Sequence, residues 1–231
     1  MSSFRNKFFI PQHEGHDCVY FCGNSLGLQP KNTTVYVNEE LQDWARLGVE
    51  GHFKPHTGWF KYHELVRDSI ANVVGALPLE VAVMNHLTVN LHLLLVSFYR
   101  PTKGRFKIIC EEKAFPSDQY MLQSQVNFHG FNPSEAIVEV KRREGENNIR
   151  LEDILAKIEE VGSELALVLW GGVNYYTGQV FDMKTITDAG HKVGAFVGFD
   201  LAHAAGNINL ELHDWNVDFA AWCSYKYMNS G

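Results

Sequence analysis

The sequence has few cysteines, no long apolar run and no excess of positive charge. Its four cysteines, Cys18, Cys22, Cys110 and Cys223, form no C-x-x-C pair, which argues against a disulfide framework and favours a reduced, cytoplasmic setting. The most apolar stretch, 91–99, is too short to cross a bilayer, and the first twelve residues lack the apolar core of a signal peptide. The formal net charge is −7, which argues against nucleic acid or a membrane surface as a partner.

The composition is that of a globular protein, because 45% of the 231 residues are apolar and 20% are charged. Apolar periodicity predicts helices over 30–48, 65–75, 116–128, 151–161 and 183–193, and one that begins near Thr88. Continuous apolar runs predict strands over 105–110, 136–140, 166–170, 195–200 and 218–222. Strands alternating with helices predict an α/β fold with a mostly parallel sheet covered on both faces.

A lysine and an aspartate stand out near the C-terminal end of this pattern. Asp200 ends one apolar run, and Lys226 follows the next. A lysine amine can form a Schiff base with pyridoxal phosphate, and a carboxylate can keep the pyridine nitrogen protonated, so that the ring accepts electrons. Both residues are expected at or just past the carboxyl ends of strands, where such sheets bind ligands, together with Gly171, Gly172 and Asn174. The plainer alternatives are a solvated surface lysine and an aspartate that caps the following turn.

Other segments offer further candidates, each with a structural alternative. Thr88, at a predicted helix start, can bind a phosphate or simply cap the helix. Phe115 can stack on a planar cofactor or belong to the core. His203 can reach the same ligand as Asp200 or be structural. The histidines and cysteines at positions 13, 16, 18 and 22 fit no common zinc spacing, so no metal site is expected.

Six segments resemble, in the same order, those of the kynureninase family of fold-type-I pyridoxal phosphate enzymes, which are related to class-V aminotransferases. They are FCGNSLGLQP (21–30), NHLTVNLHLLL (85–95), AFPSD (114–118), YYTGQ (175–179), GFDLAHAAGN (198–207) and LHDWNVDFAAWCSYKYMNSG (212–231). The resemblance runs from about Phe4 to the last residue, and its last two segments are the most specific.

The resemblance assigns roles to individual residues. It implies a catalytic pair, Lys226 and Asp200, and substrate positions at Ser25 and His52. It implies cofactor contacts from Leu87, Thr88, Phe115, Pro116, Ser117, Asp118, Asp200, His203, Tyr225 and Lys226. Among these, Leu87, Thr88 and Tyr225 would bind the phosphate. Phe115 would stack on the ring, and Asp200 would pair with its nitrogen. The sequence departs from the family at Gly171, where a serine can stand, so a hydroxyl contact to the cofactor is lost.

The implied reaction is hydrolysis of L-kynurenine or 3-hydroxy-L-kynurenine to anthranilate or 3-hydroxyanthranilate and L-alanine. It belongs to tryptophan catabolism and NAD biosynthesis, and the resemblance implies a cytoplasmic homodimer. Family members are longer at both ends, so the chain is expected to be an N-terminal fragment. In it, 1–50 would form an N-terminal segment and helix, and 51–231 an incomplete cofactor-binding large domain without the C-terminal small domain. Such a fragment is expected to be inactive and poorly stable alone.

Three alternatives stay open at this point. The first is another lyase or desulfurase of the same fold, although no cysteine has the setting of a mobile catalytic thiol. The second is a non-catalytic truncated product that binds the cofactor or a full-length partner, which a cofactor absorption band without turnover would favour. The third is an α/β binding protein without a cofactor.

Overall fold

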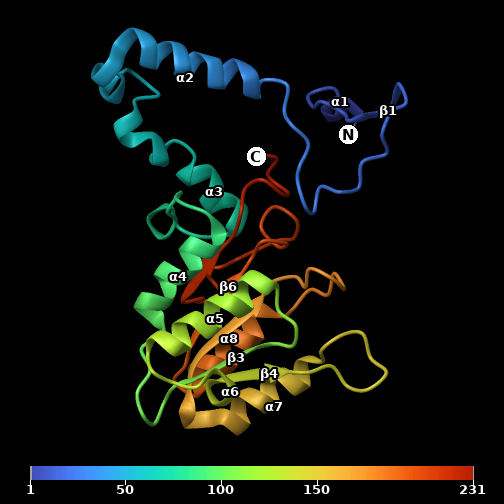
Figure 1. Cartoon of the computed structure of the whole chain (residues 1–231), viewed down its shortest axis with the longest axis vertical. Helices are drawn as coiled ribbons and strands as arrows, with labels where there is room; N and C mark the ends of the chain where they lie inside the picture. Colours follow the sequence, from blue (N-terminus) through green and yellow to red (C-terminus); the bar gives the residue numbers. More distant parts are fainter. Residues whose placement is uncertain (1, 231) are drawn as a thin grey trace. The chain divides into compact units, whose positions relative to one another are not determined.

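The computed structural model describes residues 2–230. They form two compact units, one built from the chain up to Met84 with the segment from Ser224, the other from Asn85–Cys223. Figure 1 traces the elements of both units along the chain from blue to red. The domain division expected from the sequence, with its boundary at residue 50, stays a prediction.

The second unit is built on a five-stranded sheet with the order β4-β3-β5-β6-β7. Its strands are β3 (Lys107–Glu111), β4 (Ile137–Val140), β5 (Leu165–Gly171), β6 (Phe196–Asp200) and β7 (Phe219–Ala221). Every neighbouring pair is parallel. The five predicted strands and the predicted parallel sheet are therefore confirmed.

Helices cover both faces of this sheet. They are α4 (Leu87–Phe98), α5 (Pro116–Phe128), α6 (Pro133–Ala136), α7 (Leu151–Val161) and α8 (Met183–Lys192), with a 3₁₀ turn η4 (Gly162–Glu164) before β5. Side chains of α4 and α5 pack with Ile108 and Leu167 in one core cluster. Because alternate strand residues face opposite sides, Val168 and Val197 face the other layer. There α8 lies so close that a Cβ on Gly190 would be 2.3 Å from Val197 Cγ2. The helices can be followed from green to orange in Figure 1.

The first unit contains shorter elements. They are α1 (Ser2–Arg5), β1 (Gln12–His13), β2 (His16–Asp17), α2 (Thr33–Leu47), η1 (Gly48–Phe53), η2 (Trp59–Glu64), α3 (Arg67–Val74) and η3 (Pro78–Glu80). The two strands form an antiparallel pair. Helices α2 and α3 confirm the predictions for 30–48 and 65–75, and α3 ends at Gly75 in the left-handed conformation, with φ 62°. Within the described chain, no helix is long and apolar enough to span a membrane.

The apolar stripe of α2 is not buried in the described structure. Val37, Leu41 and Trp44 recur on one face of the helix, yet each is more than half exposed, and none of the residues of α2 is buried. Apolar periodicity predicted the helix correctly here, although its apolar face is exposed within residues 2–230.

Candidate active site

Three neighbouring strands end on residues that lie at one edge of the sheet. Glu111 ends β3, Gly171 ends β5 and Asp200 ends β6, and Gly171 is the register partner of Asp200. The carboxyl edge of the sheet therefore carries two acidic side chains separated by a glycine. This is the edge at which parallel sheets bind ligands.

A third carboxyl group joins this edge from the first turn of α5. Asp118 is buried, with 6% of its surface exposed, and its side chain is hydrogen-bonded to that of Asp200. Burial, followed by the charge of Asp200, raises the pKa of Asp118 to about 9. Burial and the neighbouring charge therefore favour the protonated form of Asp118, whose O–H can donate a hydrogen bond to the Asp200 carboxylate.

The Asp200 side chain also binds the backbone of the turn that follows it. Its Oδ1 accepts a hydrogen bond from the backbone N–H of Ala202 at 2.7 Å. The turn contact considered as the plainer alternative for Asp200 is therefore present, and it coexists with the bond from Asp118. Two donors hold the carboxylate in one orientation, which a group that pairs with a ligand requires.

Sequence reasoning missed Glu111. This residue is 5% exposed and accepts a hydrogen bond from Asn174 Nδ2 at 2.8 Å. Burial raises its pKa to about 7, against the lowering effect of the Asn174 bond, and the charge of Asp200 raises it further. A signal was available, because Glu111 follows an apolar run (KIIC) as Asp200 follows FVGF.

Phe115 stands at the start of α5, next to the carboxyl cluster. It is 44% exposed, so its alternative assignment to the core is wrong. Its ring meets the Tyr175 ring edge-on, with centroids 5.2 Å apart and planes at 89°. Pro116 is in the first turn of the helix, as predicted, and Ser117 Oγ lies 3.5 Å from Asp118 Oδ1. The AFPSD segment thus brings an exposed ring and a buried carboxyl to one helix end.

The predicted phosphate-binding residues lie at the start of α4. The helix begins at Leu87 and its N-cap is His86, for which the described structure has no side-chain capping bond. Thr88 is therefore inside the helix, and its alternative role as the cap is wrong. Backbone N–H groups in the first turn of a helix have no intrahelical partner and attract anions. Within this unit, His203 follows β6 and accepts a bond from Asn207 Nδ2 through its carbonyl at 3.0 Å.

The first unit holds Tyr225 and Lys226 in a closed turn. Ser230 N donates to the carbonyl of Ser224 at 3.1 Å, and Asn229 N donates to that of Lys226 at 3.3 Å. Gly27 N donates to the carbonyl of Tyr225 at 2.7 Å, and a Cβ on Gly27 would lie 2.4 Å from the carbonyl oxygen of Lys226. The GNSLGLQP segment, which includes Ser25, therefore packs directly on the backbone of Lys226, about two hundred residues away in sequence.

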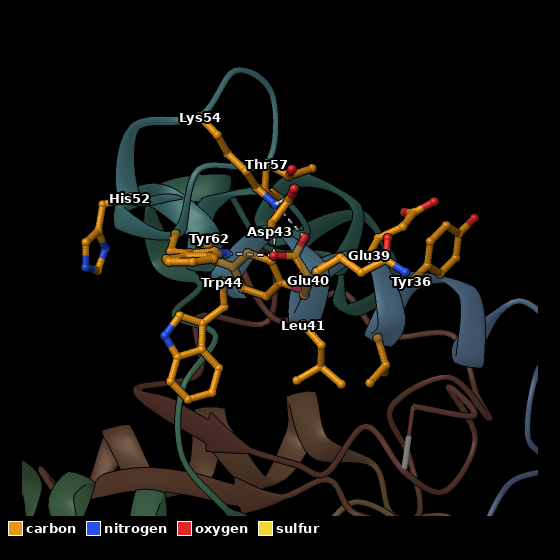
Figure 2. Close-up of a pocket in the computed structure, with 14 residues that line it drawn as sticks. Tyr36, Glu39, Glu40, Leu41, Asp43, Trp44, His52, Lys54, Thr57 and Tyr62 are labelled. Atoms are coloured by element: carbon orange, nitrogen blue, oxygen red, sulfur yellow. Dashed lines mark hydrogen bonds and ion pairs between the residues drawn. The ribbon is translucent and has the colours of Figure 1, made fainter. Parts of the chain in front are cut away.

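His52 lies on a separate pocket of the first unit (Figure 2), which has a volume of about 1060 Å³. Lys54 Nζ sits there 2.9 Å from Glu40 Oε1 and 2.7 Å from Asp43 Oδ2. These bonds raise the pKa of Lys54 and lower that of Glu40. The His52 ring lies apart from this cluster in Figure 2 and meets the Trp59 ring edge-on at 5.6 Å. The predicted substrate roles of His52 and Ser25 stay predictions.

The histidines of the N-terminal hairpin face each other across it, since His13 is the register partner of His16. Across residues 2–230, no group of three or more histidine, cysteine, aspartate or glutamate side chains is arranged to hold a metal ion.

Sequence comparison identifies close relatives. The chain is 74% identical over its whole length to the kynureninase of Flavobacterium psychrophilum, of which it covers 54%. It is 60% identical to the kynureninase of Myxococcus xanthus and 51% identical to that of Mus musculus, covering 54% and 52% of them. The chain thus spans about half the length of the curated relatives that it matches.

Solved structures share the fold at low sequence identity. A cystine C-S lyase in complex with cysteine persulfide matches with a TM-score of 0.75 at 16% identity, over 92% of this chain and 54% of that one. A variant of this lyase has glycine covalently linked to its PLP cofactor and matches with a TM-score of 0.75 at 14% identity, over 100% and 56%. A cysteine desulfurase from Thermococcus onnurineus matches with a TM-score of 0.70 at 21% identity, over 90% and 50%.

These neighbours confirm the fold-type-I architecture expected from the sequence. Residues 19–230 match the family model described as Aminotransferase class-V, a range that contains the carboxyl cluster, the start of α4 and Lys226. The chain therefore belongs to the class-V aminotransferase family.

Proposed function

We propose that the protein is a kynureninase, which uses pyridoxal 5'-phosphate to hydrolyse L-kynurenine or its 3-hydroxy form to an anthranilate and L-alanine. The proposal is supported by the 74% identity to a kynureninase over the whole chain. The structural observation that carries it is the hydrogen-bonded pair at the carboxyl edge of the sheet formed by Asp118, which is buried, and Asp200, which is half-buried. The Asp200 carboxylate can accept a charge-assisted hydrogen bond from a protonated pyridine nitrogen.

Three features of the second unit fit three parts of the cofactor. Asp200, oriented by Ala202 and Asp118, suits the ring nitrogen. The exposed ring of Phe115 suits stacking on the pyridine face. The first turn of α4, with Leu87 and Thr88, suits the phosphate. Pro116, Ser117, His203 and Tyr225 are proposed to complete the cofactor contacts.

The residues divide the chemistry between them. When bound, the cofactor supplies an aldehyde for an amine and a ring that withdraws electrons from the substrate Cα. Lys226 Nζ would hold the cofactor, and its amine would move protons at the substrate Cα as a base and then as an acid. Asp200 would pair with the protonated ring nitrogen, and Asp118 would hold Asp200 in place through their hydrogen bond. Ser25 and His52 are proposed to contact the substrate.

The relatives favour hydrolysis over the desulfurase alternative, because kynureninases match the whole chain at 51–74% identity. A desulfurase needs a reactive thiolate on an accessible, mobile segment. Cys110 and Cys223 are buried, and burial raises the pKa of the Cys110 thiol, with the neighbouring carboxylates adding to the effect, so these two thiols do not fit that role.

The test compares two proteins: the chain alone, and the chain continued by the remaining part of the Flavobacterium psychrophilum kynureninase. With pyridoxal phosphate and L-kynurenine, the longer protein should release anthranilate, followed by its fluorescence, together with L-alanine in equal amount. The chain alone should show a cofactor band and little or no turnover. Lys226→Ala should abolish release, and Lys192→Ala, at an exposed position of α8, is the control. A longer protein that binds the cofactor but leaves kynurenine intact would contradict the proposed reaction.

By the same resemblance we propose that the protein acts in tryptophan catabolism and NAD biosynthesis as a cytoplasmic homodimer. Native mass measurement of the longer protein tests the dimer. A monomer with full activity would contradict it.

A further inference from the structure

Asn174 links Glu111 to the loop that follows β5. Its side-chain nitrogen donates to Glu111 Oε2 at 2.8 Å. Its side-chain oxygen accepts from the backbone N–H groups of Tyr176 at 2.9 Å and Thr177 at 2.8 Å, and from Thr177 Oγ1 at 3.1 Å. One amide therefore closes the 174–179 loop and ties it to the end of β3.

The bond to Glu111 fixes which way this amide points. Glu111 is buried at the end of a central strand, so its carboxyl group cannot follow a moving loop. Because Glu111 Oε2 accepts from the amide nitrogen, the amide oxygen is left facing the two loop N–H groups. The conformation of the 174–179 loop thus depends on the Glu111 carboxyl group, which lies outside the loop.

Gly171 leaves room for this arrangement. A Cβ at position 171 would lie 2.7 Å from Glu111 Oε1, closer than such atoms approach in proteins, so the carboxyl group would have to shift. The Glu111 carboxyl therefore occupies the space beside the position at which the family can place a serine.

The loop in turn sets the surroundings of Phe115. Tyr175 lies between Asn174 and Tyr176, and its ring meets Phe115 edge-on. Phe115 precedes α5, and 44% of its surface is exposed. Packing contacts select the rotamer of a partly exposed aromatic side chain, and the Tyr175 ring supplies one of these contacts.

We propose that Glu111 and Asn174 are positioning residues of the cofactor site, which hold the 174–179 loop so that Tyr175 keeps Phe115 in place to stack on the pyridine ring. This inference rests on the proposed use of pyridoxal phosphate. Neither residue contacts the reacting atoms in this account, and both act through Tyr175 and Phe115.

The test uses three substitutions and one control. Glu111→Ala and Asn174→Ala remove the link, whereas Glu111→Gln keeps an acceptor oxygen for the Asn174 amide. Glu112→Gln is the matched control, because Glu112 is the next residue in the chain and lies near Arg142, 3.6 Å from its Nε. Two quantities are measured for each protein: the hydrogen-exchange rates of the Tyr176 and Thr177 amides without cofactor, and the dissociation constant for pyridoxal phosphate.

Loss of one net hydrogen bond corresponds to about a tenfold change in an equilibrium constant. We expect both alanine variants to exchange the two loop amides about tenfold faster and to bind pyridoxal phosphate about tenfold more weakly. Glu111→Gln should restore both values to near those of the wild type, and Glu112→Gln should change neither. Unchanged exchange in Glu111→Ala, or no rescue by Glu111→Gln, would overturn the inference. Failure of the wild-type protein to bind pyridoxal phosphate would contradict the proposed function instead, because the exchange comparison needs no cofactor.

Discussion

Asp200 accepts hydrogen bonds from Ala202 N and from the protonated Asp118 side chain, and we assign it the ring nitrogen of the cofactor. Asp200→Ala should still bind pyridoxal phosphate through the phosphate and ring-face contacts. Loss of a charge-assisted bond costs about 1.5–3 kcal/mol, so binding should weaken by about ten- to a hundredfold. Catalysis should fall further, because the ring loses its proton. Titration with pyridoxal phosphate and anthranilate release in the longer protein measure both effects.

The control for this substitution is Asp214→Ala, which removes a carboxylate from an exposed position of the same unit. It should leave cofactor binding and turnover near the wild-type values. Near-normal turnover in Asp200→Ala would show that another group protonates the ring.

Asp118 makes stability depend on pH. Its pKa rises from the ordinary value of 3.8 to about 9 in the folded protein. Between these values the folded state holds a proton that the unfolded state has released. The free energy of unfolding of the cofactor-free protein should therefore fall as pH rises through this window. Asp118→Asn keeps a donor for Asp200 but cannot titrate, so its unfolding free energy should fall less steeply, which denaturant melts at several pH values measure.

Asp153→Asn is a control that removes a carboxylate whose contribution to the free energy of unfolding should depend on pH in the opposite direction. The Arg143 guanidinium lowers the pKa of Asp153, so the stability that Asp153 contributes is present above its ordinary pKa and lost as pH falls. This variant should alter only the acid side of the profile. A slope between pH 4 and 9 that Asp118→Asn leaves unchanged would contradict the buried, protonated state assigned to Asp118.

At the scale of elements, the contact between the GNSLGLQP segment and the Lys226 turn depends on Gly27. A Cβ there would lie 2.4 Å from the Lys226 carbonyl oxygen and 2.9 Å from Asn229 Cα. Backbone atoms cannot move aside without shifting the turn, so Gly27→Ala should displace Lys226. We expect at least a tenfold loss of cofactor attachment to Lys226, measured by borohydride reduction and peptide mapping.

Gly23→Ala is the matched control within the same segment. A Cβ at Gly23 has no neighbour within 4 Å among the described residues, so attachment should stay at the wild-type level. Equal labelling in the two alanine variants would show that this packing does not position Lys226.

Elements with strong local signals were predicted from the sequence alone. The helices over 116–128 and 151–161 match α5 and α7 residue for residue, because Pro116 marks the start of the first and apolar periodicity defines the second. The 3₁₀ segments η1 and η2 were not predicted, since six-residue segments have little periodicity. Their shape depends on contacts such as that between Gly51 and the Trp59 ring, which a Cβ would approach to 2.3 Å.

The candidate site was predicted only in part, because only some of its residues have a local sequence signal. Asp200 was found through a specific segment, GFDLAHAAGN, whereas the role of Asp118 was implied only by the resemblance as a whole, because AFPSD alone is not specific. Glu111 follows an apolar run, which is a local signal, but its bond to Asn174 and its place beside Gly171 depend on the register of β3 beside β5, which no local pattern encodes. The residue types indicated that carboxyl groups take part in the site. Tertiary packing, which the sequence does not show, determines which of these carboxyl groups is buried enough to favour its protonated form.

For the molecule as a whole, the exposed apolar stripe of α2 is expected to lower the solubility of the 231-residue chain. Leu41 and Trp44 are each more than half exposed, and contiguous apolar surface of this kind promotes association. Replacing both residues by glutamine should raise solubility and lower binding of a hydrophobic dye, with little change in cooperative melting of the second unit. Leu95→Gln is the contrast, since Leu95 is buried in the α4–α5 core, and it should abolish that melting. Unchanged dye binding after the double substitution would contradict the exposure of this stripe.

We propose that this chain binds pyridoxal phosphate and attaches it to Lys226. The most direct measurement is to load the protein with pyridoxal phosphate, reduce it with borohydride, digest it and identify the labelled peptide by mass spectrometry. The account predicts one labelled lysine, Lys226, in the peptide that contains Ser224-Tyr225-Lys226-Tyr227, and loss of that label in Lys226→Ala. Label on a different lysine, or no label above that of the Lys226→Ala variant, would contradict it.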